Sequence, residues 1–395
     1  MSTSPTYPAT PLTVVLLIGT ALMVLTQLYL AIPLITPVST NLQGNATFAL
    51  SIAFSLCYAL GFLVWGPLSD RYGRKKVLLI GMILLVATTA LCSAAPNLGT
   101  LAALRGIQGF AAASFAPIAL AYLAEATPPR HRPLAIGAMS TAFLVAGIFG
   151  QVFAATLNLT FDTWRAVFAI SSAILALCCA LLLPARNMAE LPRTDTAHRL
   201  AQSFAVVGQL FLKPRVQLLC LAHLTVLLSF VAMYTALGTQ LTTLGSSPTQ
   251  LIWLRLVGLP GMFVALTIGF FTRRLGIINV ARISFLIAAL GLALEALLAS
   301  TLWGIAASSL VFVVGIALVV PTMITLFGET SAPYRAGGMA INGAVLFVGA
   351  SLGPLTAQLH LSFSTLLCTL AALLLVACGC LTLLEKISRK DPIAT

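Results

Sequence analysis

The chain has 395 residues, of which 59% are hydrophobic and 8% are charged, with a formal net charge of +12 and a mean hydropathy of +1.05. Soluble globular proteins carry about 25% charged residues, and a soluble chain of this length has no core large enough to hide so much apolar surface. The composition therefore excludes an ordinary soluble protein and predicts that lipid surrounds most of the chain.

The apolar residues fall into long uninterrupted stretches. A membrane helix needs roughly 20 mainly apolar residues, whereas the strands of a membrane β-barrel are about half as long and alternate with polar residues. These stretches do not alternate, so the sequence predicts an all-α membrane protein. Twelve spans are expected, at 12–37, 48–69, 77–95, 99–125, 134–158, 164–184, 216–242, 248–271, 278–299, 302–326, 336–359 and 361–384.

The basic residues indicate the orientation, because Lys and Arg in short loops favour the cytoplasm. Of the 21 Lys and Arg, 18 fall in connections on one side, Arg165 falls on the other side, and Arg105 and Arg255 lie within spans. We therefore expect a multi-pass protein of the inner (plasma) membrane with both termini in the cytoplasm. The positive charge then reflects topology beside anionic lipid, and nucleic acid is not an expected partner. The N-terminal "MSTSPTYPATP" lacks the basic flank of a cleavable signal peptide.

The spans divide into two halves that resemble repeats. The longest polar break separates a six-helix half at 1–184 from one at 216–395, with a cytoplasmic linker at 185–215. Parallel six-helix repeats occur in transporters, with the substrate site near the midplane between the halves. At a shift of 203 or 204 residues, the aligned pairs are Gly66 with Gly269, Arg71 with Arg274, Gly73 with Gly276, Pro117 with Pro321, Glu125 with Glu329, Arg132 with Arg335 and Gly150 with Gly353.

The short connection "GPLSDRYGRKK" at 66–76 holds five charges between two apolar spans. It resembles the loop between helices two and three of the major facilitator superfamily, which is written G-x-x-x-D-R-x-G-R-K/R. The stretch "RGIQGFAAASFAPIALAYLAEATPPRHR" is similar to the fourth helix of that superfamily. The resemblance covers the whole chain at the level of topology. It implies the major facilitator fold of two six-helix pseudo-repeats and points to the twelve-helix bacterial drug and sugar efflux group, which exchanges its substrate for protons.

The resemblance also implies a role for this loop. In the family, its acid and arginine bridge to neighbouring helices and latch the cytoplasmic gate, so Arg74 is expected to meet Glu125. A plain positive-inside anchor is the alternative, and it is the favoured interpretation for Lys75 and Lys76. The residues expected to form the cytoplasmic gate are Gly66, Asp70, Arg71, Gly73, Arg74, Glu125 and Arg132.

Ionisable residues inside the spans are the candidates for proton coupling, since each costs roughly 2.5–3.5 kcal/mol to insert and tends to be functional. Arg105 lies in the fourth span, where the resemblance implies either proton transfer or helix packing. The depths of Arg255 and Glu295 favour a salt bridge between them. The alternative is that Glu295 is the protonatable carboxylate. His223 is a further candidate proton carrier, although a lone histidine on a helix is more often a packed one.

Two positions depart from the efflux pattern. Gln27 stands in the first helix where many drug antiporters carry an acid. In the fifth helix, "AGIFGQVFAATL" has Gln151 in place of a proline and alanines in place of glycines, so that helix is expected to be straighter. Proton antiport is therefore less firmly predicted than transport itself.

Polar residues within the apolar spans outline a candidate substrate cavity. Binding pockets for small molecules are mostly apolar with a few placed polar groups, which suits an amphipathic organic compound. Each amide is as readily explained by a hydrogen bond between helices. The cavity candidates are Gln27, Tyr29, Gln108, Met139, Phe143, Gln151, Tyr234, Asn342 and Gln358.

Other chemistry lacks a signal in the sequence. The eight cysteines lie in apolar spans without zinc-ligand spacing, and no phosphate-binding loop for ATP is present. No metal, cofactor or catalytic group is expected, so an enzyme is disfavoured. A sensor is also disfavoured because it would be expected to carry a soluble output domain. We expect a monomeric secondary transporter that exports a small organic compound in exchange for protons by alternating access. The alternative is a facilitator or a proton-coupled importer of a small metabolite.

Overall fold

A computed structural model describes residues 10–128, 131–183, 200–332 and 334–390. The side chains of Asp70, Ala124, Glu125, Arg132, Pro133, 200–204, Pro248, Arg389 and Lys390 fall outside the description. Within the described part of the chain, 12 helices are long and apolar enough to cross a membrane, and no strand occurs. The all-α membrane fold with twelve spans is thus confirmed.

The first six spans are built from eight α-helices and one π-helical segment. These are α1 (Pro11–Tyr29), α2 (Ala31–Asn41), η1 (Phe48–Ile52), α3 (Ala53–Tyr72), α4 (Arg74–Ser93), α5 (Leu98–Ala112), α6 (Phe115–Ala126), α7 (Arg132–Phe161) and α8 (Trp164–Leu182). The short helix α9 (Leu200–Phe211) follows. The last six spans comprise α10 (Pro214–Thr243), α11 (Pro248–Val257), α12 (Leu259–Met262), η3 (Phe263–Thr267), α13 (Ile268–Leu275), α14 (Ile277–Leu297), α15 (Leu302–Thr330), α16 (Arg335–Leu352), η4 (Gly353–Leu359) and α17 (Phe363–Lys390).

Prolines explain why four expected spans are divided into shorter elements. A proline has no N–H to donate to the carbonyl four residues earlier, so the helix tends to break or kink just before it. Pro33, Pro117 and Pro260 follow the divisions between α1 and α2, between α5 and α6, and between α11 and α12. Pro354 is the second residue of η4, directly after α16 ends. By contrast, α7 runs unbroken for 30 residues and contains Gln151.

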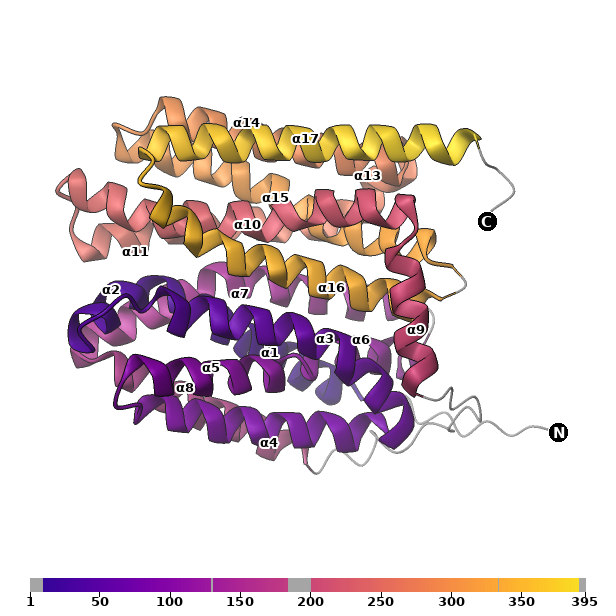
Figure 1. Cartoon of the computed structure of the whole chain (residues 1–395), viewed down its shortest axis with the longest axis horizontal. Coiled ribbons are helices and arrows are strands. Elements are labelled where there is room, and N and C mark those ends of the chain that lie inside the picture. Colours follow the sequence, from indigo (N-terminus) through magenta and orange to yellow (C-terminus); the bar gives the residue numbers. More distant parts are fainter. Residues whose placement is uncertain (1–9, 129–130, 184–199, 333, 391–395) are drawn as a thin grey trace.

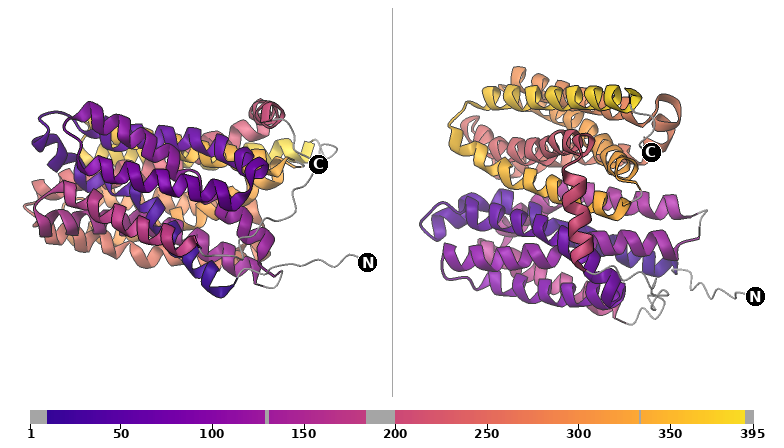
Figure 2. Two further views of the ribbon diagram at one scale, coloured as in Figure 1. Left: turned by 90° about the horizontal axis from the view of Figure 1, so that it is seen from below. Right: turned by 45° about the vertical axis from the view of Figure 1, so that its right-hand side comes forward.

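The spans gather into two groups, one made by the helices before α9 and one by the helices after it (Figure 1). The first group, drawn in indigo and purple, lies beside the second, drawn in rose to yellow, and the other views show the same division (Figure 2). Helix α1 begins and α17 ends at the end of the bundle where α9 lies across both groups. We call this the linker end and the opposite one the distal end.

The loop after α3 and the loop after α13 have the same backbone geometry. Gly73 has φ 94° and ψ 135°, and Gly276 has φ 79° and ψ 153°, and each ends one helix and directly precedes the next. This region of φ and ψ is almost restricted to glycine. Arg71 lies 5.3 Å from the ring of Tyr72, and Arg274 lies 4.2 Å from that of Phe270. The aligned glycines therefore have matching backbone conformations, although the aligned arginines lie over rings at non-equivalent positions.

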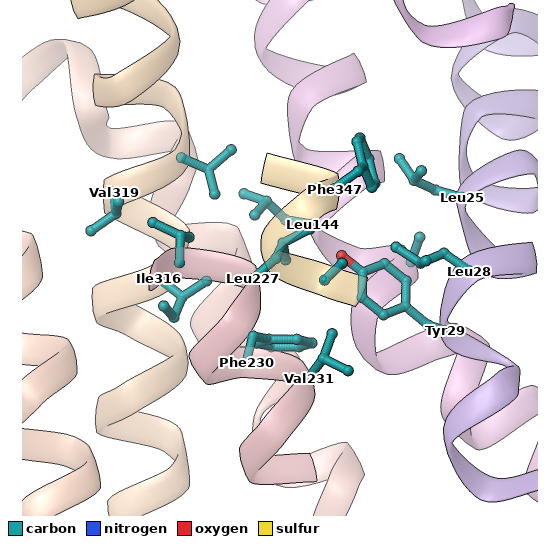
Figure 3. Packing of buried hydrophobic residues seen from close by; sticks show 14 of the residues in the cluster. Leu25, Leu28, Tyr29, Leu144, Leu227, Phe230, Val231, Ile316, Val319 and Phe347 are labelled. Atoms are coloured by element: carbon teal, nitrogen blue, oxygen red, sulfur yellow. The ribbon is translucent and has the colours of Figure 1, made fainter. Parts of the chain in front are cut away.

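The two groups meet along an apolar interface at the centre of the bundle. Tyr58 and Phe347 have ring centroids 4.1 Å apart, and Tyr29 and Phe230 are 5.8 Å apart with nearly perpendicular rings. Figure 3 shows Tyr29, Phe230 and Phe347 together with neighbouring leucine, isoleucine and valine side chains between the groups. A Cβ added at Gly343 would lie 2.0 Å from the Phe62 ring, so the helix backbone of one group lies directly against a side chain of the other.

Candidate functional site

A buried polar cluster in the first half is centred on Arg105 of α5, which is 0% exposed. Its Nε donates to the carbonyl oxygen of Leu50 at 2.8 Å, its Nη1 to Oε1 of Gln108 at 2.6 Å, and its Nη2 to the carbonyl oxygen of Gln27 at 2.9 Å. The three nitrogens of the guanidinium thus bond to groups on α1, η1 and α5.

Gln108 extends this Arg105 cluster. Its Nε2 donates to Oε1 of Gln27 at 3.2 Å and to Oγ1 of Thr89 at 2.7 Å. The guanidinium also lies 4.2 Å from the ring centroid of Phe54, a distance that favours a cation–π interaction. Such a satisfied network is the arrangement in which a buried charge stabilises a helical bundle. Arg105 therefore holds several helices of the first half together.

A second polar group lies near the distal end of the other half. Glu295 of α14 is 0% exposed, and its Oε1 accepts a hydrogen bond from Ser309 of α15 at 3.0 Å. Its Oε2 is buried and has no partner among the described residues. Glu295 is also the only buried carboxylate in the part of the chain that the structure describes.

The predicted salt bridge between Arg255 and Glu295 is not formed, so that expectation was wrong. Both side chains are described, and neither makes an ion pair. The positions of the two residues along the sequence gave similar depths, but depth does not fix the direction in which a side chain leaves its helix. Glu295 faces α15, where it meets Ser309. Tyr234 of α10 lies near both Arg255 and Glu295.

His223 lies in the part of α10 nearer the linker end and is fully buried. Its ring packs against Phe327 with centroids 5.6 Å apart. Neither ring nitrogen has a hydrogen-bond partner among the described residues. The packing is that of an aromatic core residue, while the two unpartnered nitrogens keep His223 among the candidates for proton transfer.

The cavity candidates lie in several different environments. Gln27 and Gln108 belong to the Arg105 cluster, and Tyr29 packs against Phe230 at the interface. Gln358 is exposed at the distal end in η4 and is therefore not part of a buried cavity. The remaining candidates are buried or partly buried: Met139, Phe143, Gln151, Tyr234 and Asn342.

A cavity of about 290 Å³ is found at a different place. It lies between α3, α9 and α16, and residues such as Leu63, Phe211 and Ile341 line it. None of the predicted cavity residues contributes to its wall. This apolar cavity therefore differs in position and character from the mixed polar and apolar cavity that the sequence predicts.

The loop of the first half shows one contact that bears on its role. Lys75 donates to the carbonyl oxygen of Leu183 at 3.1 Å, which ties the start of α4 to the end of α8. The side chains of Asp70, Glu125 and Arg132 fall outside the described ones, so the latch with Arg74 stays a prediction. Gly66 lies within the last two turns of α3, and Gly73 directly follows the end of that helix.

Sequence reasoning missed three groups that shape these clusters. Thr89 and the carbonyl oxygen of Leu50 complete the Arg105 cluster, and Ser309 is the partner of Glu295. Hydroxyl side chains are common in apolar spans and usually bond to their own helix, so they give no separate signal. The buried charge nearby is the only indication that a hydroxyl group is needed there.

Comparison with known proteins identifies the family. The model of the Major Facilitator Superfamily matches residues 16–354. The chain belongs to the major facilitator superfamily. Membership in this superfamily indicates a transporter of small molecules in a lipid bilayer rather than an enzyme.

Three bacterial relatives illustrate the likeness. A probable actinorhodin transporter of Streptomyces coelicolor is 30% identical over 152 residues, covering 37% of this chain and 26% of the relative. Multidrug resistance protein 3 of Bacillus subtilis is 30% identical over 125 residues, covering 32% and 24%. The uncharacterized MFS-type transporter YceJ of Bacillus subtilis is 28% identical over 207 residues, covering 52% and 50%. The matches thus span between about a quarter and a half of these relatives.

Proposed function

We propose that this major facilitator protein exports a small amphipathic organic compound in exchange for protons. The two groups of six helices would rock about the central apolar interface, so that the compound is exposed first to one side of the membrane and then to the other. Two of the relatives are named for actinorhodin and for multidrug resistance, which supports a drug-like cargo. We place the linker end in the cytoplasm of a cell with this protein in its inner membrane, where it acts as a monomer.

Glu295 is the observation that carries proton coupling in this proposal. A carboxylate that is removed from water and holds one unpartnered oxygen gains stability when it is protonated. An intramembrane carboxylate is a functional candidate by default, since it is costly to insert. Ser309 holds one oxygen in place and leaves the other to take up the proton. Glu295 is therefore our proton carrier, with His223 as the second candidate.

The test uses purified protein in liposomes with an imposed pH gradient and a panel of lipophilic dyes and small sugars. We expect gradient-driven accumulation of at least one compound, and a loss of at least tenfold in Glu295→Gln. Glu329→Gln is the matched control, because Glu329 is an exposed carboxylate at the linker end of α15. Coupling kept in Glu295→Gln but lost in His223→Asn would move the proton site to His223.

A facilitator or proton-coupled importer is the second candidate, and one observation favours it. Helix α7 runs unbroken through Gln151, where antiporters of this superfamily carry a glycine and proline motif. The same liposomes separate the two functions. Movement of a compound only down its own gradient would indicate a facilitator, and uptake together with protons would indicate an importer. Either result would contradict export in exchange for protons.

A further inference from the structure

Arg255 is the least satisfied charged residue among those the structure places inside a span. Only 2% of its surface is exposed, and its Nε and Nη1 are buried without a partner among the described residues. Burying a guanidinium costs a great deal of free energy unless its donors are bonded. The Arg105 side chain, by contrast, bonds through all three nitrogens. Its donors are thus open to an acceptor that the described residues do not supply in this structure.

Tyr234 lies beside Arg255 in the same half. A Cβ added at Gly258 would lie 2.9 Å from the Tyr234 hydroxyl, so the absent side chain of Gly258 lets that hydroxyl approach the end of α11. Gly258 is three residues after Arg255 and therefore lies on nearly the same face of the helix. The Tyr234 hydroxyl is buried and has no hydrogen-bond partner in the described part of the chain.

Gln151 of α7 approaches the same place from the other half. Two contacts fix the register: Ile148 lies against Gly258, and Gly147 lies against Phe230. On α7, Gln151 lies about one turn closer to the distal end than Ile148 and Gly147. On α11, Arg255 lies about one turn closer to the distal end than Gly258. On α10, Tyr234 lies about one turn closer to the distal end than Phe230. The backbone positions of the three residues thus lie at a similar level. The Gln151 side chain folds back along α7, where its Nε2 donates to the carbonyl oxygen of Gly147 at 2.7 Å. Oε1 of Gln151 is buried and accepts no hydrogen bond from any described residue.

We propose that Arg255 and Tyr234 bind the carboxylate of an organic acid, which is the transported compound. The planar guanidinium offers paired donors that match a carboxylate, and the Tyr234 hydroxyl adds one more. Gln151 acts as a positioning residue, because its Oε1 accepts from Arg255 when the halves close and orients the guanidinium. The rest of the compound lies against the apolar side chains at the interface, among them Tyr29 and Phe230.

This inference rests on the proposed function and names its substrate class. With an inside-negative potential, the exit of an anion and the entry of a proton are both electrically favourable. In this proposal different residues hold the carboxylate and the proton, because Arg255 and Glu295 form no ion pair with each other. The two sites can therefore be occupied in different steps of the cycle.

The test measures binding by the full chain in detergent micelles, so that it does not depend on proton coupling. The probe is the fluorescent acid dansyl-aminoundecanoic acid, and its methyl ester has the same apolar body without the charge. We expect the wild-type protein to bind the acid at least tenfold more tightly than the ester. Arg255→Met should abolish this preference, Tyr234→Phe should reduce it several-fold, and Gln151→Leu should reduce it less.

Arg165→Gln is the matched control, because Arg165 is an arginine at the distal end that already donates to the carbonyl oxygens of Ser93 and Ala95. It should keep the preference for the acid. Equal binding of acid and ester by the wild-type protein, no binding of either, or an unchanged preference in well-folded Tyr234→Phe and Arg255→Met would overturn the proposal. A preserved preference without pH-driven transport would leave this inference standing and remove proton exchange instead.

Discussion

Each half of the molecule buries one arginine inside a span, and the two arginines have opposite surroundings. Arg105 bonds to Leu50, Gln108 and Gln27 and lies over the Phe54 ring. Arg255 is equally buried but has no bond to either its own half or the other one among the described residues. The first arrangement stabilises a fixed set of helices. The second leaves unpaired guanidinium donors at the boundary where the two halves must separate and rejoin.

The comparison indicates that the two halves share their close glycine packing between helices but differ in the roles of their buried polar residues. Glycines pack directly against backbone in both: a Cβ at Gly109 would lie 2.2 Å from the carbonyl oxygen of Phe54, and one at Gly291 would lie 2.3 Å from the Phe312 nitrogen. The surroundings of the two buried arginines have diverged, since Arg105 lies in a closed hydrogen-bond network and Arg255 keeps open donors. The second half is therefore the one in which we expect changes to alter transport more than folding.

The largest expected loss of stability comes from filling the close glycine contacts that both halves contain. Gly109→Val and Gly291→Val each force a side chain into a neighbouring backbone, which cannot move without separating two helices. We expect each to cost about 4 kcal/mol or more and to remove the monodisperse peak in size-exclusion chromatography. Gly379→Val is the control, because a Cβ there meets nothing within 4 Å. A normal peak for either buried variant would show that the packing is looser than described.

Gln108→Leu tests whether the hydrogen bonds around Arg105 stabilise the fold, in contrast to the surroundings of Arg255. It removes the acceptor of Arg105 Nη1 and the donor to Thr89 and Gln27 while keeping a similar volume. Leaving buried donors and acceptors unpaired should cost about 3 kcal/mol, measured as a lower midpoint of thermal unfolding. Cys92→Ala is a nearby comparison, since its sulfur makes only a weak 3.8 Å contact with Gln108. Equal midpoints for Gln108→Leu and the wild type would refute the role of the Arg105 cluster in holding the helices together.

Substitutions in the two loops at Gly73 and Gly276 should lower the stability by a smaller amount, and by a similar amount in each half. Gly73→Ala and Gly276→Ala place a side chain where φ is positive, which should cost about 1–2 kcal/mol in each case. Unfolding midpoints of the two variants should fall by similar amounts. Gly208→Ala, in helix α9, is the control because a Cβ there meets nothing within 4 Å. Clearly unequal losses would mean that the two loops are not equivalent in the folded protein.

Ser309→Ala should have the smallest effect on stability. It removes a single hydrogen bond to Glu295 at 3.0 Å and should cost about 1 kcal/mol or less if the carboxyl group is protonated. The informative measurement is the pH at which transport in liposomes is half-maximal, which should rise because the carboxylate form loses its donor. A pH profile identical to that of the wild type would argue against Glu295 as the proton carrier.

The sequence predicts much of the fold because the signals involved are local. Apolar length locates the twelve spans, and prolines such as Pro33 and Pro117 explain where the structure divides them. The site is harder to predict because it depends on rotation about each helix axis. Arg255 and Glu295 were expected to pair by depth, yet Glu295 faces Ser309. Gln358 lies exposed in η4 after Pro354, so its place in the cavity stays a prediction.

The central claim is that Arg105 serves the fold and Arg255 serves a ligand. The most direct measurement compares the thermal unfolding midpoints of Arg105→Met and Arg255→Met with that of the wild type, all free of ligand. Removing an unpaired buried charge relieves its desolvation cost, so we predict that Arg255→Met unfolds about 2 °C higher than the wild type. Arg105→Met should unfold well below it. A fall of similar size in both variants would contradict the account, because Arg255 would then also be part of the structural framework.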